Sequence, residues 1–262
     1  MFLRYAKPIV KSVPVLSALL RPVYKAFGPK GLGTPSARRY CLLLPDLVKS
    51  PFFVKIGAND GTTGDPVSDI LLADERWKGL LVEPVPYIFK RLAANFSDSS
   101  RFSLERAAIG ESNGEATFYY VDPRAAHEIP NLPEWYDQLG SFDRNHIIKH
   151  LNGVLEPFII EECVPVRTLE HLFRDGGTKD VHLLQIDTEG HDYEVLKSVD
   201  LAKLLPLAIY VEHKNISRSD KVEMLKGLRG RGYRIDDCGG DYFAVHRTSP
   251  LRSLVRDMAI PL

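Results

Sequence analysis

Residues 52–64 have the sequence FFVKIGANDGTTG, in which an apolar run leads directly into a glycine-bearing turn. Residues 51–56 predict a buried strand, and residues 65–73 predict the helix that follows the turn. Gly57 and Gly61 allow the backbone of the turn to pass close to a ligand. This order of elements predicts a ligand-binding turn, with a plain strand-to-helix connection as the alternative.

The charges around this turn favour a cationic ligand. The turn is not the GxGxxG of dinucleotide-binding proteins, so that fingerprint is only half met. A pyrophosphate would also meet Asp60 and Asp65, and carboxylates repel an anion. Asn59 and Asp60 tolerate the left-handed backbone that such turns need.

The chain from residue 51 onward alternates short apolar runs with amphipathic stretches, which is typical of an α/β protein with a parallel sheet. The predicted strands are residues 51–56, 79–84, 101–110, 115–121, 181–187 and 206–213. The predicted helices are residues 65–73, 86–96, 141–151, 191–199 and 217–229. The segments GYRIDD and GDYFAVHR predict an antiparallel hairpin around Gly239 and Gly240.

Glu83 ends the second predicted strand, 22 residues beyond Gly61. An acid about 20 residues after a glycine turn, at the tip of the neighbouring strand, is placed to hold ribose hydroxyls. A carboxylate can accept hydrogen bonds from both vicinal hydroxyls. The alternative is a solvated glutamate at a strand end. Together with the turn, Glu83 predicts a cofactor that carries a nucleoside.

Charge is distributed unevenly along the chain. Residues 1–45 hold eight basic and no acidic side chains, so the balance of 34 basic and 34 acidic residues leaves residues 46–262 with a net charge of −8. An acidic body argues against a nucleic-acid partner. We therefore divide the chain into a leader, residues 1–45, and a main domain, residues 46–262. The leader fits either an interfacial anchor on anionic lipid or a helix packed on the domain surface.

The three cysteines are Cys41, Cys163 and Cys238, an odd number without a CxxC pair. This usage is typical of a reducing compartment and indicates neither a disulfide framework nor a zinc site. We expect a cytoplasmic protein, with peripheral membrane contact through the leader left open.

Several segments resemble a known family. VKIGANDG, LLVEP, Asn95, RAAIG, VRTLEHL, LLQIDTEGHDYEVL and YVEH occur in the order of the FkbM-type S-adenosylmethionine-dependent methyltransferases. The resemblance covers roughly residues 50–246, and IDTEGHDYEVL is its most specific part. It implies a class I methyltransferase fold: a Rossmann-like three-layer α/β sandwich whose seven-stranded, mostly parallel sheet has an antiparallel last strand. It also implies S-adenosyl-L-methionine as cofactor and hydroxyl oxygens of sugars, glycans or secondary metabolites as acceptors.

The resemblance assigns cofactor contacts to residues within these motifs. The turn that would wrap the methionine and ribose contains Gly57, Ala58, Asn59, Asp60 and Gly61. Glu83 would hold the ribose, and the residues near the adenine would be Arg106, Ala107 and Ala108. Asp187 and Glu189 would border the sulfonium and the acceptor.

One position departs from the family. Many members have an acid two residues before the first motif glycine, where it helps to hold the cofactor's amino group, and this chain has Lys55. Either Lys55 points away while Asp60, Asp65 or Asp187 takes that role, or cofactor binding is impaired.

Two further strand ends carry candidate catalytic residues. LLQIDTEGH places Asp187, Glu189 and His191 after one strand, and YVEH places Glu212 and His213 after the next. Adjacent strands lie about 4.8 Å apart, so these side chains can converge on one pocket. We expect His213 to be the general base, oriented by Glu189 or Glu212, with Asp187 beside the transferred methyl group.

A metal site is the competing interpretation. Asp187, Glu189 and His213 offer the ligand types that suit Mg²⁺ or Mn²⁺, although a divalent cation is not the favoured reading. A third alternative is that these residues only cap the next helix. His146 and His150 lie one helical turn apart, without a third ligand nearby in the sequence.

Residues 122–155 form an irregular segment that we predict to be a lid on the acceptor side. Trp135, Tyr136 and the pair Tyr119–Tyr120 could stack on sugar rings. The favoured function is thus an O-methyltransferase. The alternatives are an NAD-dependent oxidoreductase and a degenerate methyltransferase-like protein that binds without turnover; the oxidoreductase is disfavoured by the incomplete GxGxxG and by the acidic turn.

Overall fold

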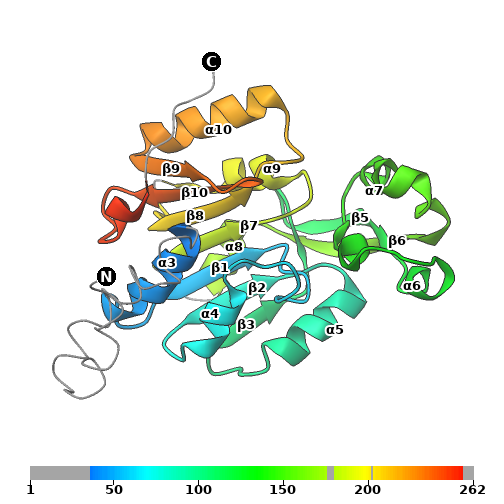
Figure 1. The fold of residues 1–262 in the computed structure, drawn as a ribbon, viewed down its shortest axis with the longest axis horizontal. Coiled ribbons are helices and arrows are strands. Elements are labelled where there is room, and N and C mark those ends of the chain that lie inside the picture. Colours follow the sequence, from blue (N-terminus) through cyan, green and yellow to red (C-terminus); the bar gives the residue numbers. More distant parts are fainter. Residues whose placement is uncertain (1–35, 176–179, 202, 256–262) are drawn as a thin grey trace, which may run out of the picture.

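The computed structural model describes residues 36–175, 180–201 and 203–255 (Figure 1). Their main sheet has seven strands in the order β3-β2-β1-β7-β8-β10-β9. The strands are β1 (Phe52–Ile56), β2 (Lys78–Val82), β3 (Phe102–Glu105), β7 (Leu183–Ile186), β8 (Ala208–Glu212), β9 (Tyr233–Asp237) and β10 (Asp241–His246). β10 pairs antiparallel with β8 and β9, and the four pairings that link β3, β2, β1, β7 and β8 are parallel. The predicted seven-stranded sheet with an antiparallel last strand is confirmed, as is the hairpin at Gly239 and Gly240.

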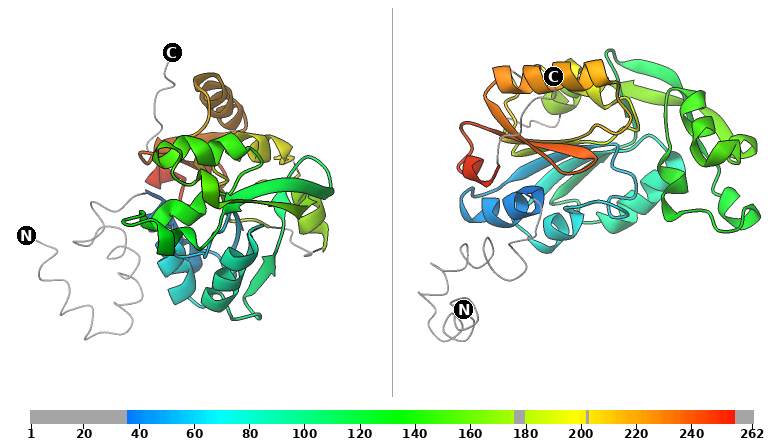
Figure 2. Two further views of the ribbon diagram at one scale, coloured as in Figure 1. Left: turned by 90° about the vertical axis from the view of Figure 1, so that its right-hand side faces the viewer. Right: turned by 45° about the horizontal axis from the view of Figure 1, so that its top comes forward.

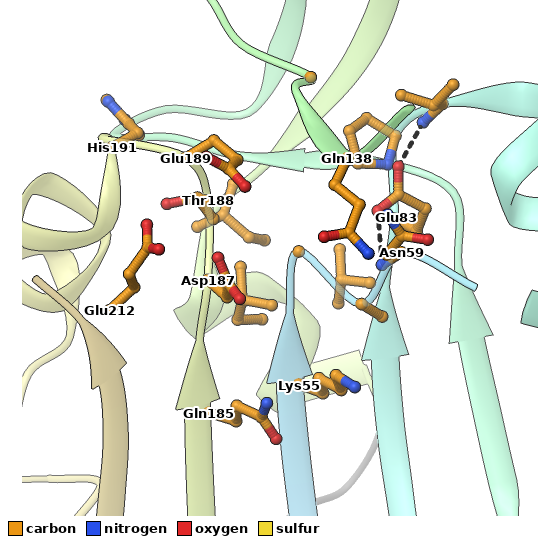
Figure 3. A pocket seen from close by; sticks show the side chains of 18 of the residues that line it. Lys55, Asn59, Glu83, Gln138, Gln185, Asp187, Thr188, Glu189, His191 and Glu212 are labelled. Carbon is orange, nitrogen blue, oxygen red and sulfur yellow. Dashed lines mark hydrogen bonds between the residues drawn. The ribbon is translucent and has the colours of Figure 1, made fainter. Parts of the chain in front are cut away.

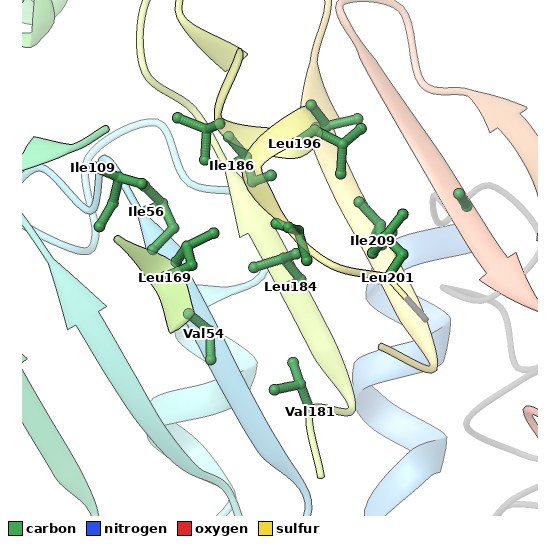
Figure 4. Close-up of a cluster of buried hydrophobic side chains, with 14 of the residues drawn as sticks. Val54, Ile56, Ile109, Leu169, Val181, Leu184, Ile186, Leu196, Leu201 and Ile209 are labelled. Atoms are coloured by element: carbon green, nitrogen blue, oxygen red, sulfur yellow. The ribbon is translucent and has the colours of Figure 1, made fainter. Parts of the chain in front are cut away.

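Helices cover both faces of this sheet and complete the predicted three layers (Figure 1). One face packs against α3 (Ser36–Leu43), α4 (Ser68–Ala73) and α5 (Pro86–Asn95). The other face packs against α8 (Leu169–Asp175), α9 (Asp192–Ser198) and α10 (Arg218–Gly230). Figure 4 shows the second of these cores, with aliphatic side chains from β1, β7, β8, α8 and α9 in contact.

The alternation of side chains along β1 explains why the sheet has two cores. Val54 and Ile56 belong to the core beneath α8, α9 and α10, and Phe53 belongs to the core on the opposite face. Successive residues of a strand point to opposite faces, so a central parallel strand must be apolar on both. Lys55 is the exception, because it lies buried on the same face as Phe53.

A second, three-stranded sheet has the order β4-β6-β5. Its strands are β4 (Ala108–Ile109), β5 (Gly114–Val121) and β6 (Ile159–Arg167). The prediction of one strand over residues 101–110 is therefore wrong: the chain leaves the main sheet after Glu105 and enters the small sheet at Ala108. β6 was not predicted.

The segment between β5 and β6 lies with the small sheet to one side of the main sheet (Figures 1 and 2). It contains the short helices α6 (Ala125–Glu128), η2 (Glu134–Gln138), α7 (Arg144–Lys149), η3 (His150–Gly153) and η4 (Glu156–Phe158). Asp143 begins α7 by accepting a 2.9 Å hydrogen bond from the backbone N–H of Asn145. Val121, Ala125, Leu139, Ile147 and Leu155 form a small core of its own. We call residues 122–155 the lid segment.

Residues 36–45, which the charge pattern assigns to the leader, pack into the main domain. Tyr40, Cys41 and Leu44 are fully buried beside α4 and β2, and the indole N–H of Trp77 donates to the carbonyl of Cys41 over 3.2 Å. The short helices η1 (Leu44–Asp46) and η5 (Arg252–Leu254) also border this face. The rest of the leader, residues 1–35, lies outside the described residues, so its two interpretations stay predictions. In the described part of the chain, no helix combines the length and apolar character needed to cross a bilayer.

Candidate active site

A cavity of about 210 Å³ lies at the carboxyl ends of β1, β2, β7 and β8 (Figure 3). Parallel strands of one sheet bring their carboxyl ends to one edge, which is where ligands bind in such folds. The glycine turn, Glu83, the 187–191 turn and part of the lid segment all line this cavity.

The glycine turn fits tightly between its neighbouring strands. The backbone N–H groups of Gly57 and Ala58 donate to the carbonyl of Val82 over 3.1 and 2.9 Å. Gly57 has a φ of +70°, and a Cβ there would lie 1.7 Å from the carbonyl oxygen of Asp187. Only glycine fits this position, because any side chain would collide with the backbone of the 187–191 turn.

Glu83 is buried at the end of β2 and faces the cavity. Its Oε2 accepts from the N–H of Asn59 and its Oε1 from the N–H of Val85, each over 2.9 Å (Figure 3). Burial raises the pKa of Glu83 to about 7 despite these two hydrogen bonds. Each carboxylate oxygen keeps a lone pair for a ligand. Glu83 therefore fixes the glycine turn and also presents an acceptor to the cavity.

Three of the predicted cofactor contacts lie away from the cavity wall. The carboxylate of Asp60 accepts from the N–H groups of Thr62 and Thr63, each over 2.8 Å, and so closes its own turn. Gly61 packs against Phe96. The half-exposed Arg106 lies 3.9 Å from Glu162, beyond the end of β3. The assignment of these three residues to the cofactor stays a prediction that the cavity lining does not support. The predicted residues that do line the cavity are Gly57, Ala58, Asn59, Glu83, Ala107, Ala108, Asp187, Glu189 and Glu212.

Lys55 and Asp65 form a buried ion pair with 2.7 Å between Nζ and Oδ2. Gln185 donates to the same oxygen over 2.5 Å, and the N–H groups of Val67 and Ser68 donate to Oδ1. Burial alone would raise the pKa of Asp65, but Lys55 and the hydrogen bonds lower it to about 2. All four lone pairs of Asp65 are thus in use. Three acids could take the role of the family's acid. Two of them, Asp60 and Asp65, already use their carboxylates in hydrogen bonds or an ion pair within the chain.

The 187–191 turn follows β7 and is stabilised by hydrogen bonds to the side chain of Asp192. The fully buried carboxylate of Asp192 accepts from the N–H of Thr188 over 2.7 Å and from the N–H of Gly190 over 3.0 Å. Glu189 and Gly190 have positive φ values of 54° and 100°, so the chain turns back sharply at this point. This arrangement directs Asp187 and Glu189 toward the cavity (Figure 3).

Asp187 is the free carboxylate of the site. It faces the cavity, where it is exposed to solvent, and its carboxylate receives no hydrogen bond from any described residue. Although Asp187 is open to the cavity, desolvation by the surrounding walls raises its pKa well above the usual range, and the carboxylates of Glu212 and Glu189 raise it further. A cation in the cavity would relieve this repulsion.

Glu212 reaches the same cavity from the end of β8, whereas His213 does not. Glu212 accepts from Lys214 over 3.3 Å and from Asn215 over 3.1 Å. Burial, together with Glu189, raises its pKa to about 7. The ring of His213 stacks on Tyr242 with a centroid distance of 3.9 Å and lies outside the cavity wall. His213 follows the last residue of β8 and lies on the other side of the chain from Glu212, as the alternation of side chains along an extended segment predicts. The expected convergence of five residues is therefore reduced to four.

The lid segment supplies cavity residues that sequence reasoning missed. Asp137, Gln138 and the residues 140–142 line the cavity opposite the strand ends. Gln138 donates to the carbonyl of Thr63 over 3.2 Å, which joins the lid segment to the loop after the glycine turn. The predicted aromatic contacts lie elsewhere, and the rings at the cavity are Phe118, Phe142 and Tyr210. No motif marked these positions, because they meet only when the lid segment folds.

A helix of the lid segment contacts the 187–191 turn. Nε2 of His146 lies 3.5 Å from Oε2 of Glu189, and the rings of Phe142 and His191 meet edge to face with centroids 5.4 Å apart. His146 and His150 are adjacent, with ring centroids 4.8 Å apart. In the described residues, neither histidine belongs to a group of metal-ligating side chains.

The carboxylates that approach one another closely enough to share a metal ion are Asp187, Asp192 and Glu212, whose ligand atoms lie within 4.8 Å. Within the described ranges, the alternative set of Asp187, Glu189 and His213 is not brought together. Asp192 already accepts three hydrogen bonds from the 187–191 turn, and Glu212 pairs with Lys214. The donor set therefore suits an organic cation held by charge better than a tightly coordinated metal ion.

A family model described as the methyltransferase FkbM domain matches residues 55–235. No curated protein sequence matches the chain. Among solved structures, a chain in the crystal structure of a fibrillarin/Nop5p complex is similar to this one at 14% identity and a TM-score of 0.39, over 79% of each chain.

Proposed function

Because the chain belongs to the methyltransferase FkbM family, we propose that it transfers the methyl group of S-adenosyl-L-methionine to a hydroxyl oxygen of a sugar, a glycan or a secondary metabolite. The coarser activity, methyl transfer, follows from the family. The cofactor and the acceptor class rest on the residues of the cavity.

The observation that supports this cofactor is the placement of Glu83 and Asp187 on either side of the glycine turn. Glu83 ends β2 and Asp187 follows β7, and both strands pair with β1, which carries the turn. A buried carboxylate with spare lone pairs suits vicinal ribose hydroxyls. An unpaired carboxylate among other carboxylates suits a positive charge. An adenosyl sulfonium compound carries both a ribose and a positively charged sulfur.

The residues of the cavity fit the needs of methyl transfer to oxygen. The cofactor supplies a methyl group activated by a positively charged sulfur. The protein must align the acceptor and take up its proton. Glu212 suits the second task, because a pKa of about 7 lets it accept a proton near neutral pH. Glu189 and Gln138 offer hydrogen bonds to other hydroxyls of the acceptor.

Calorimetric titration with S-adenosylhomocysteine and with NAD tests the cofactor. We expect micromolar affinity for the first compound and no binding of the second. Glu83→Ala should abolish binding while the protein stays folded, and the exposed Glu75→Ala serves as the matched control. Binding of NAD alone would contradict the proposal.

A second experiment tests the acceptor. Sugars, polysaccharides and polyketides are incubated with the enzyme and cofactor, and mass spectrometry measures the gain of one methyl group. Transfer should persist after treatment with a chelator, because the cavity carboxylates need no metal ion in this scheme. Loss of transfer on chelation, restored by Mg²⁺, would instead support a cation at Asp187 and Glu212.

A further inference from the structure

Among the described residues that line the cavity, most of the ionisable side chains are acidic. Seven are acids, namely Asp65, Glu83, Asp137, Asp187, Glu189, Glu212 and Asp241, and two are lysines, Lys55 and Lys214. A ligand with an anionic group must place that group beside one of these lysines, because elsewhere it would face like charge.

The two lysines differ in their exposure and in how tightly each is paired with a carboxylate of the protein. Lys55 is 4% exposed and shares its charge with Asp65 inside the protein. Lys214 has a side chain that is 64% exposed, and its Nζ lies 3.3 Å from Oε1 of Glu212. Such a half-open pair can rearrange around a ligand at little cost. Lys214 is therefore the lysine that can meet an anion in the cavity.

Gly240 holds Lys214 over the cavity. A Cβ on Gly240 would lie 2.0 Å from Cε of Lys214 and 3.0 Å from both Cγ and Cδ. The aliphatic part of Lys214 thus lies across the bare backbone of the turn between β9 and β10. The next residue, Asp241, lines the cavity and accepts a 3.0 Å hydrogen bond from the hydroxyl of Tyr210. An ammonium and a carboxylate therefore stand side by side at this end.

The order of the strands places this pair at one end of the proposed ligand. Glu83 follows β2, Asp187 follows β7, and Lys214 lies two residues after β8. Asp241 is the first residue of β10. From β2 to β8 the cavity crosses three strand spacings, about 14 Å. With the ribose at Glu83 and the sulfonium at Asp187, the amino-acid end of the cofactor extends toward Lys214.

We propose that Lys214 binds the carboxylate of the cofactor's methionine group, with Asp241 beside it facing the α-ammonium, and that Gly240 is a positioning residue for Lys214. The inference rests on the proposed function. It gives this chain a zwitterion site at the β8 and β10 ends, away from the position of Lys55.

Two ligands separate this role from a general effect on the cavity. S-adenosylhomocysteine carries the amino-acid group, and 5′-deoxy-5′-methylthioadenosine lacks it. Calorimetry measures both with the full chain and with Lys214→Gln, Lys214→Arg and Gly240→Ala. Lys226→Gln on the exposed surface of α10 is the matched control.

Lys214→Gln should lose about tenfold in affinity for S-adenosylhomocysteine, since a charged hydrogen bond is removed. Its affinity for methylthioadenosine should equal that of the wild type. Lys214→Arg should retain most of the affinity, and Gly240→Ala should lose affinity for the first ligand alone.

Two results overturn the inference. Equal losses for both ligands in Lys214→Gln would indicate a structural role, and unchanged affinity for both would exclude any role. In either case a wild-type protein that binds methylthioadenosine still supports the proposed function. A wild type that binds neither ligand overturns the proposed function and this inference together.

Discussion

The ammonium of Lys55 lies 2.7 Å from the carboxylate of Asp65, and both side chains are buried. The pair explains how a lysine can occupy a strand position next to the glycine turn. Asp65 neutralises it, and Gln185 and Ser68 complete the hydrogen bonds. Asp65 is therefore the counter-ion of Lys55, and Asp187 is left free to face a ligand.

Removal of Lys55 should destabilise the fold. Lys55→Met leaves the buried Asp65 without its cation, and we expect the free energy of unfolding to fall by about 3–5 kcal/mol. Lys55→Met with Asp65→Asn should recover much of that loss, because no uncompensated charge remains. Urea unfolding at neutral pH measures both. Equal stability of the single and double variants would contradict the ion-pair interpretation.

The stability of the ligand-free protein should fall as the pH rises from about 5 to about 8. The pKa of Glu212 is raised from 4.5 to about 7 in the folded state. Its contribution is thus fully present below pH 4.5 and is lost as the pH passes 7. Glu212→Gln should remove this part of the dependence and be about 1–3 kcal/mol more stable than the wild type at the alkaline end. Unfolding curves across this pH range measure the slope, and Glu75→Gln should keep the wild-type slope.

Gly57→Ala should abolish cofactor binding and lower the free energy of unfolding by about 2–4 kcal/mol. The added Cβ would meet the carbonyl of Asp187 at 1.7 Å in a backbone conformation that suits glycine. Gly230→Ala is the matched control, because Gly230 ends α10 with open space around it and should gain slightly in stability. Calorimetry and thermal unfolding measure the two effects, and a Gly57→Ala protein with normal affinity would refute the account of the turn.

His213→Ala should keep the wild-type affinity for S-adenosylhomocysteine. The ring lies outside the cavity wall and stacks on Tyr242, so its loss should cost about 1–2 kcal/mol of stability and no binding. Once an acceptor is known, turnover should persist in His213→Ala and fall in Glu212→Gln. The opposite pattern would restore His213 as the base.

The contact between His146 and Glu189 should hold the lid segment against the 187–191 turn. In His146→Ala, amide hydrogen exchange in α7 and in residues 137–142 should be several-fold faster, with little change in the midpoint of unfolding. His127→Ala, an exposed histidine of α6, should exchange as the wild type does. Unaltered exchange in His146→Ala would show that other contacts secure the lid segment.

Local patterns predict the main sheet well, because its strands are short apolar runs that end in glycine, acid or proline. The glycine turn, Glu83 and Asp187 were placed at one edge for the same reason. β6 was missed, since Glu161, Glu162 and Pro165 interrupt its apolar alternation and only pairing with β5 makes it a strand. Charge composition likewise grouped residues 36–45 with the leader, although Tyr40 and Cys41 are core residues.

The side chains at the strand ends show the limit of such reasoning. Strand spacing predicts that Glu212 and His213 approach the cavity, but the direction of each side chain depends on which face of β8 it occupies. The lid residues Gln138 and Phe142 carry no motif, because their place depends on how an irregular segment folds over distant loops. Asp60 illustrates a further case, in which a polar residue in a turn satisfies its own backbone rather than a ligand.

The small sheet and the lid segment lie between β3 and β7 as a single uninterrupted excursion of the chain. Apart from Ala107 and Ala108, the residues expected to contact the cofactor follow strands of the main sheet, whereas the opposite wall comes mostly from that excursion. Substitutions, insertions or deletions within this one contiguous stretch can therefore change the acceptor specificity. The residues proposed to bind the methyl donor on the main sheet would remain unchanged.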